Sequence, residues 1–279
     1  MIFTRPAPFR TARRALALGA MTALALSVPA ARALGEEAAQ ERFEKTYELT
    51  GVTKVRIQNV NGIIRIETGD KDQLHVVAIK KVKGADAEDT LKQTEIRVTK
   101  TGETISIETI LPKKMNRFRF LFWGRQDNAD VEYDLTLPAG IRVEAETVNG
   151  RIVATGRTGS LVLNTVNGSV KVDSQDAPLK VNTVNGSVEV AFAGPMRKAD
   201  LETVNGSVTV SCSKESSIRY DLQTVNGRIQ SEFASLNVEG KWGPKEARGD
   251  INGGREHLSV ETVNGEVRLR SSEVAVTKK

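Results

Sequence analysis

Short stretches of alternating apolar and polar residues recur along the chain, and an Asn-Gly pair interrupts each of them. Counted from the Asn, apolar residues stand six and four positions before it and three positions after it, as at Leu161, Leu163 and Val170 around Asn167. Such alternation predicts a half-buried β-strand on each side of the pair. Asn and Gly both tolerate positive φ, so we expect a tight corner that shifts the inward-facing parity.

This corner is the most repeated motif in the sequence. Val-Asn-Gly occurs seven times, six of them after Thr, and from Asn149 the spacings are 18, 18, 20, 21 and 38 residues. A period near 20 residues with near-identical units predicts a β-solenoid, because stacked coils place equivalent side chains over one another. A meander of hairpins is the alternative, since Asn-Gly also forms hairpin turns. The expected structural corner residues are Asn61, Gly62, Asn149, Gly150, Asn167, Gly168, Asn185, Gly186, Asn205, Gly206, Asn226, Gly227, Asn264 and Gly265.

Two stretches depart from the period. The last spacing is twice 19, which predicts a degenerate coil or an inserted hairpin between Ser235 and Gly254. The corner at Asn61 stands alone, and we expect it to belong to the first coil. The residues that follow it predict an α+β cap over the N-terminal end, where an open sheet edge would invite aggregation. Its expected elements are a strand over Leu74–Val82, a helix over Ala85–Gln93, two strands within Thr94–Leu111, and a strand over Asp130–Leu137.

The N-terminus has the pattern of an export signal. Basic residues at Arg5, Arg10, Arg13 and Arg14 precede the apolar run 15–28, and Ala31-Arg32-Ala33 forms a cleavage site. This predicts a secretory signal peptide; Sec or twin-arginine export, and cleavage or retention as an anchor, are open alternatives. Residues 1–33 hold five of the 40 Lys and Arg and none of the 35 Asp and Glu. The remaining chain is therefore neutral, and its charge does not predict nucleic-acid binding.

These patterns divide the chain into five segments. We expect a signal peptide at 1–33, an N-terminal strand and first coil at 34–68, a capping insertion at 69–140, a Thr-Val-Asn-Gly solenoid at 141–272, and a C-terminal tail at 273–279.

Residues typical of catalysis or metal binding are scarce. Cys212 is the single cysteine, and the two histidines, His75 and His257, stand in unrelated contexts, so we expect no cofactor, no metal and no enzyme. The stacked Asn side chains should satisfy one another. A polar residue precedes each Thr, and in chain order amides separate the acids, which argues against a paired-carboxylate glycosidase site. These residues, expected on one solvent-facing strip, are Glu146, Asn164, Asn182, Glu202, Gln223 and Glu261.

Residues 113–125 differ from the rest of the chain in composition. They combine five positive charges with four aromatic residues. One interpretation is a packed hairpin strand; the other is an exposed tip that contacts a membrane surface or a protein partner. The candidate interaction residues are Arg117, Phe118, Arg119, Phe120, Phe122 and Trp123.

The chain resembles an adhesin-like bacterial family of unknown function that is built from short β-strand repeats. The resemblance rests on residues 55–62, on the segment ending at 135–140, and on the serial Thr-Val-Asn-Gly copies, and it spans about residues 43–270. It implies an all-β, right-handed β-solenoid, with about seven coils in this chain, that is exported or envelope-associated. It implies no catalytic residues.

Three functions follow as hypotheses. The first is an exported, periplasmic or extracellular module that binds an envelope protein or glycan surface, or has a structural role, without catalysis. The second is a membrane-surface or envelope-stress sensor that acts through residues 113–125. The third is a β-helix enzyme that acts on polysaccharides.

Overall fold

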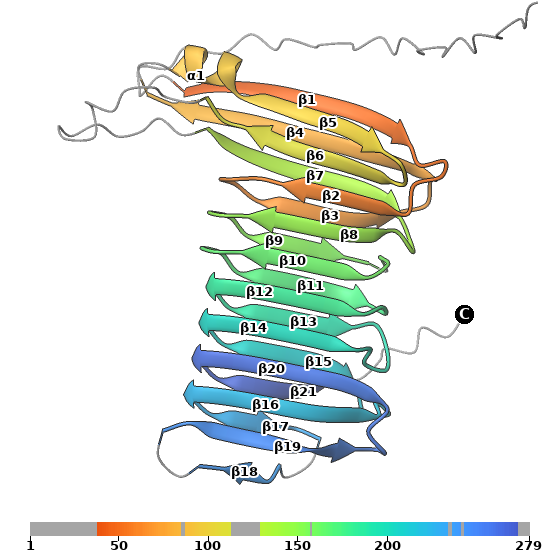
Figure 1. Cartoon of the computed structure of the whole chain (residues 1–279), viewed down its shortest axis with the longest axis vertical. Coiled ribbons are helices and arrows are strands. Elements are labelled where there is room, and N and C mark those ends of the chain that lie inside the picture. Colours follow the sequence, from red (N-terminus) through yellow and green to blue (C-terminus); the bar gives the residue numbers. More distant parts are fainter. Residues whose placement is uncertain are drawn as a thin grey trace, which may run out of the picture. The chain divides into compact units, whose positions relative to one another are not determined.

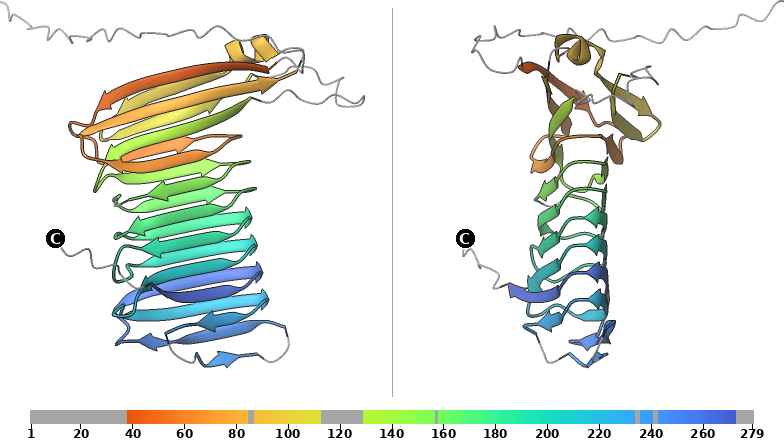
Figure 2. Two further views of the ribbon diagram at one scale, coloured as in Figure 1. Left: turned by 180° about the vertical axis from the view of Figure 1, so that it is seen from behind. Right: turned by 90° about the vertical axis from the view of Figure 1, so that its left-hand side faces the viewer.

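The computed structural model describes residues 38–84, 87–112, 129–156, 158–233, 236–240 and 243–272. These residues form two large β-sheets that face each other across a shared apolar core, with the strands of each sheet stacked in a ladder (Figure 1). An edge-on view separates the two layers (Figure 2). The first sheet, called sheet A, has ten strands, and the second, called sheet B, has eleven.

The strands of both sheets are ordered from the same end of the stack. The strand order in sheet A is β1 (Ala38–Glu48), β4 (Gln73–Lys83), β7 (Asp130–Pro138), β3 (Ile64–Gly69), β9 (Ile152–Thr155), β11 (Val170–Gln175), β13 (Val188–Phe192), β15 (Val208–Ser213), β21 (Val267–Ser272) and β17 (Ile229–Ser231). The strand order in sheet B is β5 (Glu95–Thr101), β6 (Thr104–Ile110), β2 (Lys54–Gln58), β8 (Arg142–Thr147), β10 (Leu161–Thr165), β12 (Leu179–Asn185), β14 (Ala199–Asn205), β20 (Glu256–Asn264), β16 (Ile218–Asn226), β19 (Lys245–Ile251) and β18 (Val238–Glu239).

Each repeat contributes one strand to each sheet. A strand of sheet B ends at the Asn-Gly corner, and the chain continues into a strand of sheet A, as from β12 to β13. Successive repeats pair in parallel and in register, so Thr183 lies beside Thr203 and Asn185 beside Asn205. Parallel pairing excludes the hairpin meander, because hairpin strands are antiparallel. The fold is therefore all-β and solenoid-like.

The inward-facing rows follow the sequence pattern. The residues six and four positions before each Asn, and those three after it, are buried in the repeats from Asn149 to Asn205. Within one repeat, Leu161, Leu163 and Val170 are each at most 1% exposed. Burial of such an aliphatic side chain contributes about 1.5–3 kcal/mol, so stacked coils share a continuous core that no coil could form alone. The Thr of each motif also faces inward and is buried.

The order of coils in space differs from their order in the chain at both ends. The last coil, β20 and β21, lies between β14 and β15 on one side and β16 and β17 on the other. The stretch between Ser235 and Gly254 contributes the hairpin β18–β19, and β19 pairs antiparallel with β16. The inserted-hairpin alternative is therefore confirmed.

The coil at Asn61 is the first in chain order, and strands of the segment 69–140 stack beyond it. Its strands β2 and β3 lie between β8 and β9 on one side and β6 and β7 on the other. The later strands β6 and β7 extend both sheets beyond it in parallel register, because their apolar faces continue the same core. The antiparallel strands β1, β4 and β5 follow at the edges.

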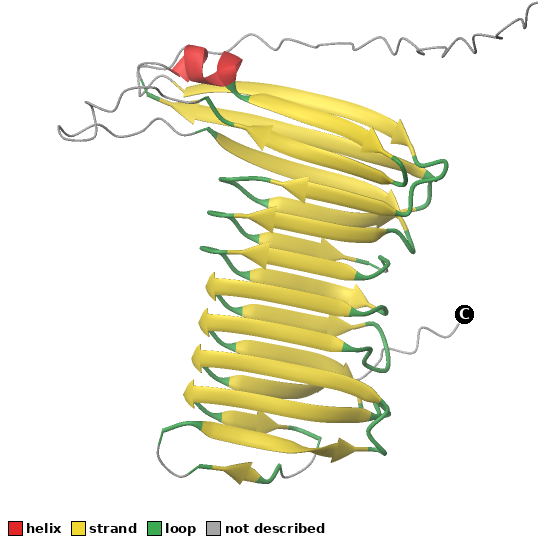
Figure 3. Ribbon diagram, in the orientation of Figure 1, coloured by secondary structure: helices red, strands yellow, loops and turns green. Residues whose placement is uncertain are grey.

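The interrupting segment contains the expected elements. Strands β4, β5, β6 and β7 coincide closely with the predicted strands, and the described helix α1 spans Ala87–Gln93. It packs beside β1 and β4 at the end of the stack (Figure 3). Two acids, Glu88 and Asp89, occupy its first turn, where the helix dipole favours negative charge.

The corner glycines have a different cause from the one expected. Positive φ was predicted for them, but among the seven it occurs at Gly62 alone, with φ 110°. At Gly186, a Cβ would overlap the carbonyl oxygen of Gly168 in the neighbouring coil. The same overlap recurs from Gly150 to Gly265. Glycine is required there because backbones of adjacent coils approach closely, and not because of its φ freedom.

Candidate functional site

A row of exposed valines runs along the outer face of sheet B. The Val of each Thr-Val-Asn-Gly motif follows an inward-facing Thr and therefore faces outward. Six of these valines are 38–41% exposed, and they make up all but one of the exposed large apolar residues in the described part of the chain. Contiguous exposed apolar surface of this kind is typical of a binding site. The row consists of Val148, Val166, Val184, Val204, Val263 and Val225, in the order of their strands in the sheet.

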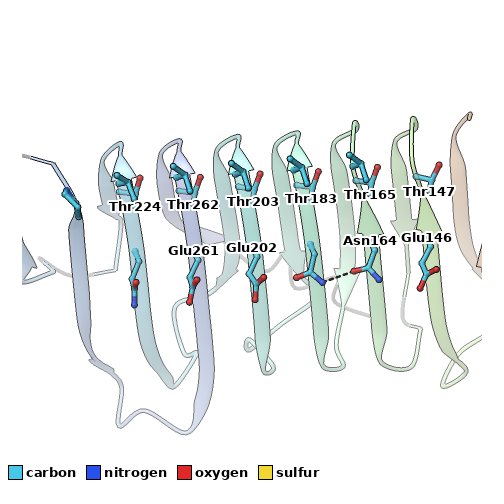
Figure 4. Close-up of a pocket in the computed structure, with 18 of the residues that line it drawn as sticks. Glu146, Thr147, Asn164, Thr165, Thr183, Glu202, Thr203, Thr224, Glu261 and Thr262 are labelled. Atoms are coloured by element: carbon cyan, nitrogen blue, oxygen red, sulfur yellow. Dashed lines mark hydrogen bonds between the residues drawn. The ribbon is translucent and has the colours of Figure 1, made fainter. Parts of the chain in front are cut away.

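A polar row runs parallel to the valines, two residues earlier on each strand. It contains the residues expected on a solvent-facing strip, and Figure 4 shows Glu146, Asn164, Glu202 and Glu261 at one level across the strands of sheet B. The intervening Thr side chains point inward, so the Thr backbone forms the floor between the two outward rows. The prediction of a common polar strip is confirmed.

Together the two rows line a groove of about 1070 Å³, which we call the valine groove. It extends from Gln58 and Asn59 on the β2 side to the β18–β19 hairpin, where Gly240, Pro244 and Lys245 line its end. With strands spaced about 4.8 Å apart, the seven strands from β2 to β16 give it a length of about 29 Å. The shape suits an elongated ligand that lies along the stack.

The corner asparagines form a continuous hydrogen-bonded ladder at the edge of the groove. The ladder begins at Asn61 Oδ1, and from Asn149 through Asn264 to Asn226 each Asn Nδ2 donates to the Asn Oδ1 of a neighbouring coil at 2.7–2.9 Å. The side chains thus satisfy one another, as expected from the sequence. This ladder stabilises the corner and leaves the neighbouring groove as the surface available for a ligand.

The buried threonines bind the corners from inside. Thr165 Oγ1 donates to Gly150 O at 3.0 Å, and the equivalent bond recurs at Thr183, Thr203, Thr224 and Thr262. Thr147 Oγ1 is the exception, because it has no hydrogen-bond partner among the described residues. The preceding coil has Asn59 in place of Thr, and its Nδ2 donates to Asn61 O and Val131 O at 2.9 and 2.8 Å.

Charge is balanced unevenly along the polar row. Gln58 Nε2 donates to Glu146 at 2.7 Å and Arg56 Nη2 at 3.2 Å. These bonds, first that of Gln58 and then that of Arg56, hold the pKa of the Glu146 carboxyl below its ordinary value. Farther along, Lys180 Nζ lies 3.9 Å from Glu202 but 3.3 Å from Asp200. No ion pair with Glu261 occurs in the described part of the chain.

Chain order predicted that amides separate the acids of the polar row, and this prediction is wrong for one pair. Glu202 on β14 lies directly beside Glu261 on β20, because the last coil is inserted next to β14 (Figure 4). Glu261 lies in turn beside Gln223. The groove therefore contains two adjacent carboxylates that the chain order had placed on opposite sides of a glutamine.

Other candidate groups lie away from the groove. Cys212 is buried, and burial raises the pKa of its thiol, which disfavours a nucleophilic thiolate. His75 Nδ1 lies 3.1 Å from Thr46 Oγ1 on β1, while His257 is exposed on β20. Across the described ranges, no three His, Cys, Asp or Glu side chains are arranged to hold a metal ion. No described helix has the length and hydrophobicity that a membrane span requires.

Two sequence predictions fall outside the described residues. The signal peptide at 1–33 is one. The other is the basic aromatic segment with Arg117, Phe118, Arg119, Phe120, Phe122 and Trp123. Both stay predictions.

The valine row and the closing hairpin were not recognised as parts of a site from the sequence. The parity that placed Thr inward also implied an outward Val, so the valine row had a sequence signal. Lys245 and Glu246 had none, because only the antiparallel pairing of β19 with β16 brings them to the groove.

The repeat region is similar to a known domain family. Residues 142–270, which carry most of the groove, match the family model described as Toastrack DUF4097. A search of the curated proteins found no match to the sequence.

Several solved structures of bacterial proteins are similar to the chain. A proposed cell adhesion protein of Clostridium sporogenes is 14% identical, with a TM-score of 0.48 over 84% of this chain and 100% of that one. A proposed adhesin of Bacteroides fragilis is 12% identical, with a TM-score of 0.42 over 82% and 97%. A proposed lipid-binding protein of Parabacteroides distasonis is also 12% identical, with a TM-score of 0.28 over 83% and 95%.

Proposed function

We propose that the chain, whose residues 142–270 match the Toastrack DUF4097 family model, is an exported, adhesin-like binding module of the bacterial envelope. In this proposal residues 1–33 direct export to the periplasm or cell exterior, and the module binds an envelope protein or glycan surface without catalysis. Residues 69–140 cap a right-handed solenoid of about seven coils, the first at 34–68 and the others at 141–272. Right-handed connections between parallel strands occur in about 98% of cases, which supports that hand.

The observation that carries this proposal is the valine groove. Its six valines are 38–41% exposed on sheet B, whereas most strand valines in the described residues are buried. Exposed β-branched residues stacked on successive strands form an apolar strip, and the polar row beside them supplies hydrogen bonds. A long apolar strip with a polar rim has the composition of a binding surface.

Co-sedimentation with bacterial envelope fractions tests the proposal. The purified chain should sediment with the fraction, and replacing Val166, Val184 and Val204 together by Thr should reduce the bound share several-fold. Thr has nearly the shape of Val and favours strands, so the fold should persist. The matched control is Val153→Thr on the outer face of sheet A, which should bind as the wild type. Equal binding by all variants, or none by the wild type, would contradict the proposal.

A specific observation keeps polysaccharide cleavage as a second candidate function. Glu202 and Glu261 are adjacent in the groove, and glycosidases use two carboxylates about 5–9.5 Å apart. Incubation with purified envelope polysaccharide, followed by a reducing-end assay, tests it. Release of new ends by the wild type and not by Glu202→Gln would favour the enzyme; no release by either would exclude this substrate.

A further inference from the structure

The polar row contains a run of hydrogen-bond acceptors without matching donors. Asn182 Nδ2 donates to Asn164 Oδ1 at 2.8 Å, which turns Asn182 Oδ1 toward the next strand. That oxygen is buried and has no partner among the described residues. The next two residues in the row are Glu202 and Glu261, and carboxylates only accept. If the side-chain amides of Asn164 and Asn182 were both flipped, Asn164 Oδ1 would instead face the Glu146 carboxylate. That carboxylate is also an acceptor, and it already accepts from Gln58 and Arg56.

This run of acceptors also carries excess negative charge. Arg56 Nη2 forms an ion pair with Glu146 Oε1 at 3.2 Å. Lys180 Nζ, in contrast, lies 3.9 Å from Glu202 Oε1 and is nearer to Asp200. Within the described ranges, Glu261 has no cationic neighbour in an ion pair. A ligand that supplies both positive charge and several N–H donors would complement this part of the groove.

Apolar surface lies directly beside these acceptors. Val184, Val204 and Val263 follow Asn182, Glu202 and Glu261 by two residues on the same strands, and they are 38–39% exposed. A ligand group that fits both features has an apolar stem and a charged tip. The lysine side chain has this form, with a four-carbon stem and an ammonium group that donates three hydrogen bonds.

The repeat of the groove matches one extended polypeptide conformation. Strands recur about every 4.8 Å, so two strands span about 9.6 Å. A polyproline II helix repeats every three residues with a rise of about 3.1 Å each, which gives about 9.3 Å. A β-strand ligand repeats about every 6.6–6.8 Å, which matches neither the spacing of one strand of the groove, about 4.8 Å, nor that of two, about 9.6 Å. Polyproline II also leaves its backbone groups unbonded, so they remain free for the amides of Asn164 and Gln223.

We propose that the valine groove binds a lysine-bearing polypeptide segment in the polyproline II conformation, with a lysine ammonium group on Glu202 and Glu261 and apolar residues over the valines. The inference deepens the proposed function and rests on it, since it names the chemistry of the partner. A glycan or a membrane surface would not require the ammonium group at this carboxylate pair.

Fluorescence anisotropy with a labelled Pro-Pro-Lys repeat peptide tests the inference on the full purified chain. A peptide of about twelve residues spans about 37 Å and covers the groove. We expect saturable binding that weakens at high salt, and a loss of at least about tenfold in affinity for the double variant Glu202→Gln with Glu261→Gln, which corresponds to about 1.4 kcal/mol. A Pro-Pro-Glu peptide should not bind.

The matched control removes two charges from the opposite sheet. Glu67 and Glu189 are exposed on sheet A, and changing both to Gln should leave the affinity within about twofold, because long-range charge is screened beyond about 10 Å. Equal losses in both double variants would show that only net charge attracts the peptide and would overturn the inference. Binding of spermidine with the same dependence on Glu202 and Glu261, but no binding of the peptide, would also overturn it.

The two proposals can fail separately. Both proposals stand if two results are obtained. The double variant Glu202→Gln with Glu261→Gln binds neither the peptide nor the envelope fraction, and envelope binding by the wild type depends on the valines. If the variant loses no peptide affinity while the envelope co-sedimentation remains valine-dependent, the lysine inference fails and the proposed function stands. If the wild type does not bind the envelope fraction at all, the proposed function fails, whatever the peptide measurement shows.

Discussion

Thr165 and Thr147 occupy equivalent buried positions on neighbouring strands, but their hydroxyl groups differ in hydrogen bonding. Thr165 Oγ1 donates to Gly150 O at 3.0 Å, whereas Thr147 Oγ1 has no partner in the described part of the chain. Replacement of Thr165 by Val should lower the free energy of unfolding by about 1–3 kcal/mol, because a buried carbonyl loses its donor. Thr147→Val should leave it unchanged or raise it by up to about 1 kcal/mol. Urea denaturation of both variants measures the difference, and equal effects would contradict the assignment.

The corner glycine is a second residue-scale feature with a matched control. A Cβ at Gly186 would overlap the Gly168 carbonyl, whereas a Cβ at Gly194 would meet no atom within 4 Å. Gly186→Ala should destabilise the fold by at least about 1–3 kcal/mol, because two coils must separate. Gly194→Ala should be neutral or slightly stabilising, since it restricts the unfolded chain. Thermal unfolding of the pair tests this; a stable Gly186→Ala variant would show that coils are not closely stacked at the corner.

At the scale of elements, the order of strands in sheet B makes a direct prediction. Glu202 lies beside Glu261, and Gln223 lies one strand farther. Cysteines on adjacent strands can form a disulfide, whereas those two strands apart, at about 9.6 Å, cannot. In a Cys212→Ala background, cysteines at 202 and 261 should crosslink and cysteines at 202 and 223 should not. Non-reducing electrophoresis distinguishes them, and the reverse result would place β16 directly on β14.

Strands β2 and β8 are joined by an interaction that depends on pH. Bonds from Gln58 and Arg56 lower the pKa of Glu146 from 4.5 in the folded state. The resulting stability is fully present above that value and is lost as the pH falls through the lower pKa of the folded protein. Glu146→Gln should therefore reduce the loss of melting temperature between neutral pH and about pH 3. An unchanged acid dependence in this variant, compared with Glu189→Gln as control, would exclude the interaction.

At the scale of the whole molecule, the described coils form a linear stack in which each contacts only its neighbours. Inward residues of β12 and β14 are buried, whereas β17 is partly exposed and β18 is exposed. Opening should therefore begin at the β17–β18 end, where fewer buried contacts must be lost. Hydrogen exchange followed by mass spectrometry should show the slowest amides in β12 and β14 and the fastest in β17 and β18. Uniform protection would indicate all-or-none opening instead.

The sequence by itself determined the repeating strands, their inward rows and the stacked asparagines. These follow from local chemistry. The alternation of apolar and polar residues determines which side chains face the core, and identical side chains stacked on one another stabilise parallel, in-register pairing. It also located the polar strip that lines the groove.

Only the tertiary structure decided which coils are neighbours. The core faces of the coils are nearly identical, so the sequence does not distinguish a coil that stacks in chain order from one that inserts between two others. The insertion of β20 brings Glu261 beside Glu202, and the pairing of β19 with β16 closes the groove with Lys245. The cause of the corner glycines was likewise invisible, because the atom that excludes a side chain at Gly186 belongs to another coil.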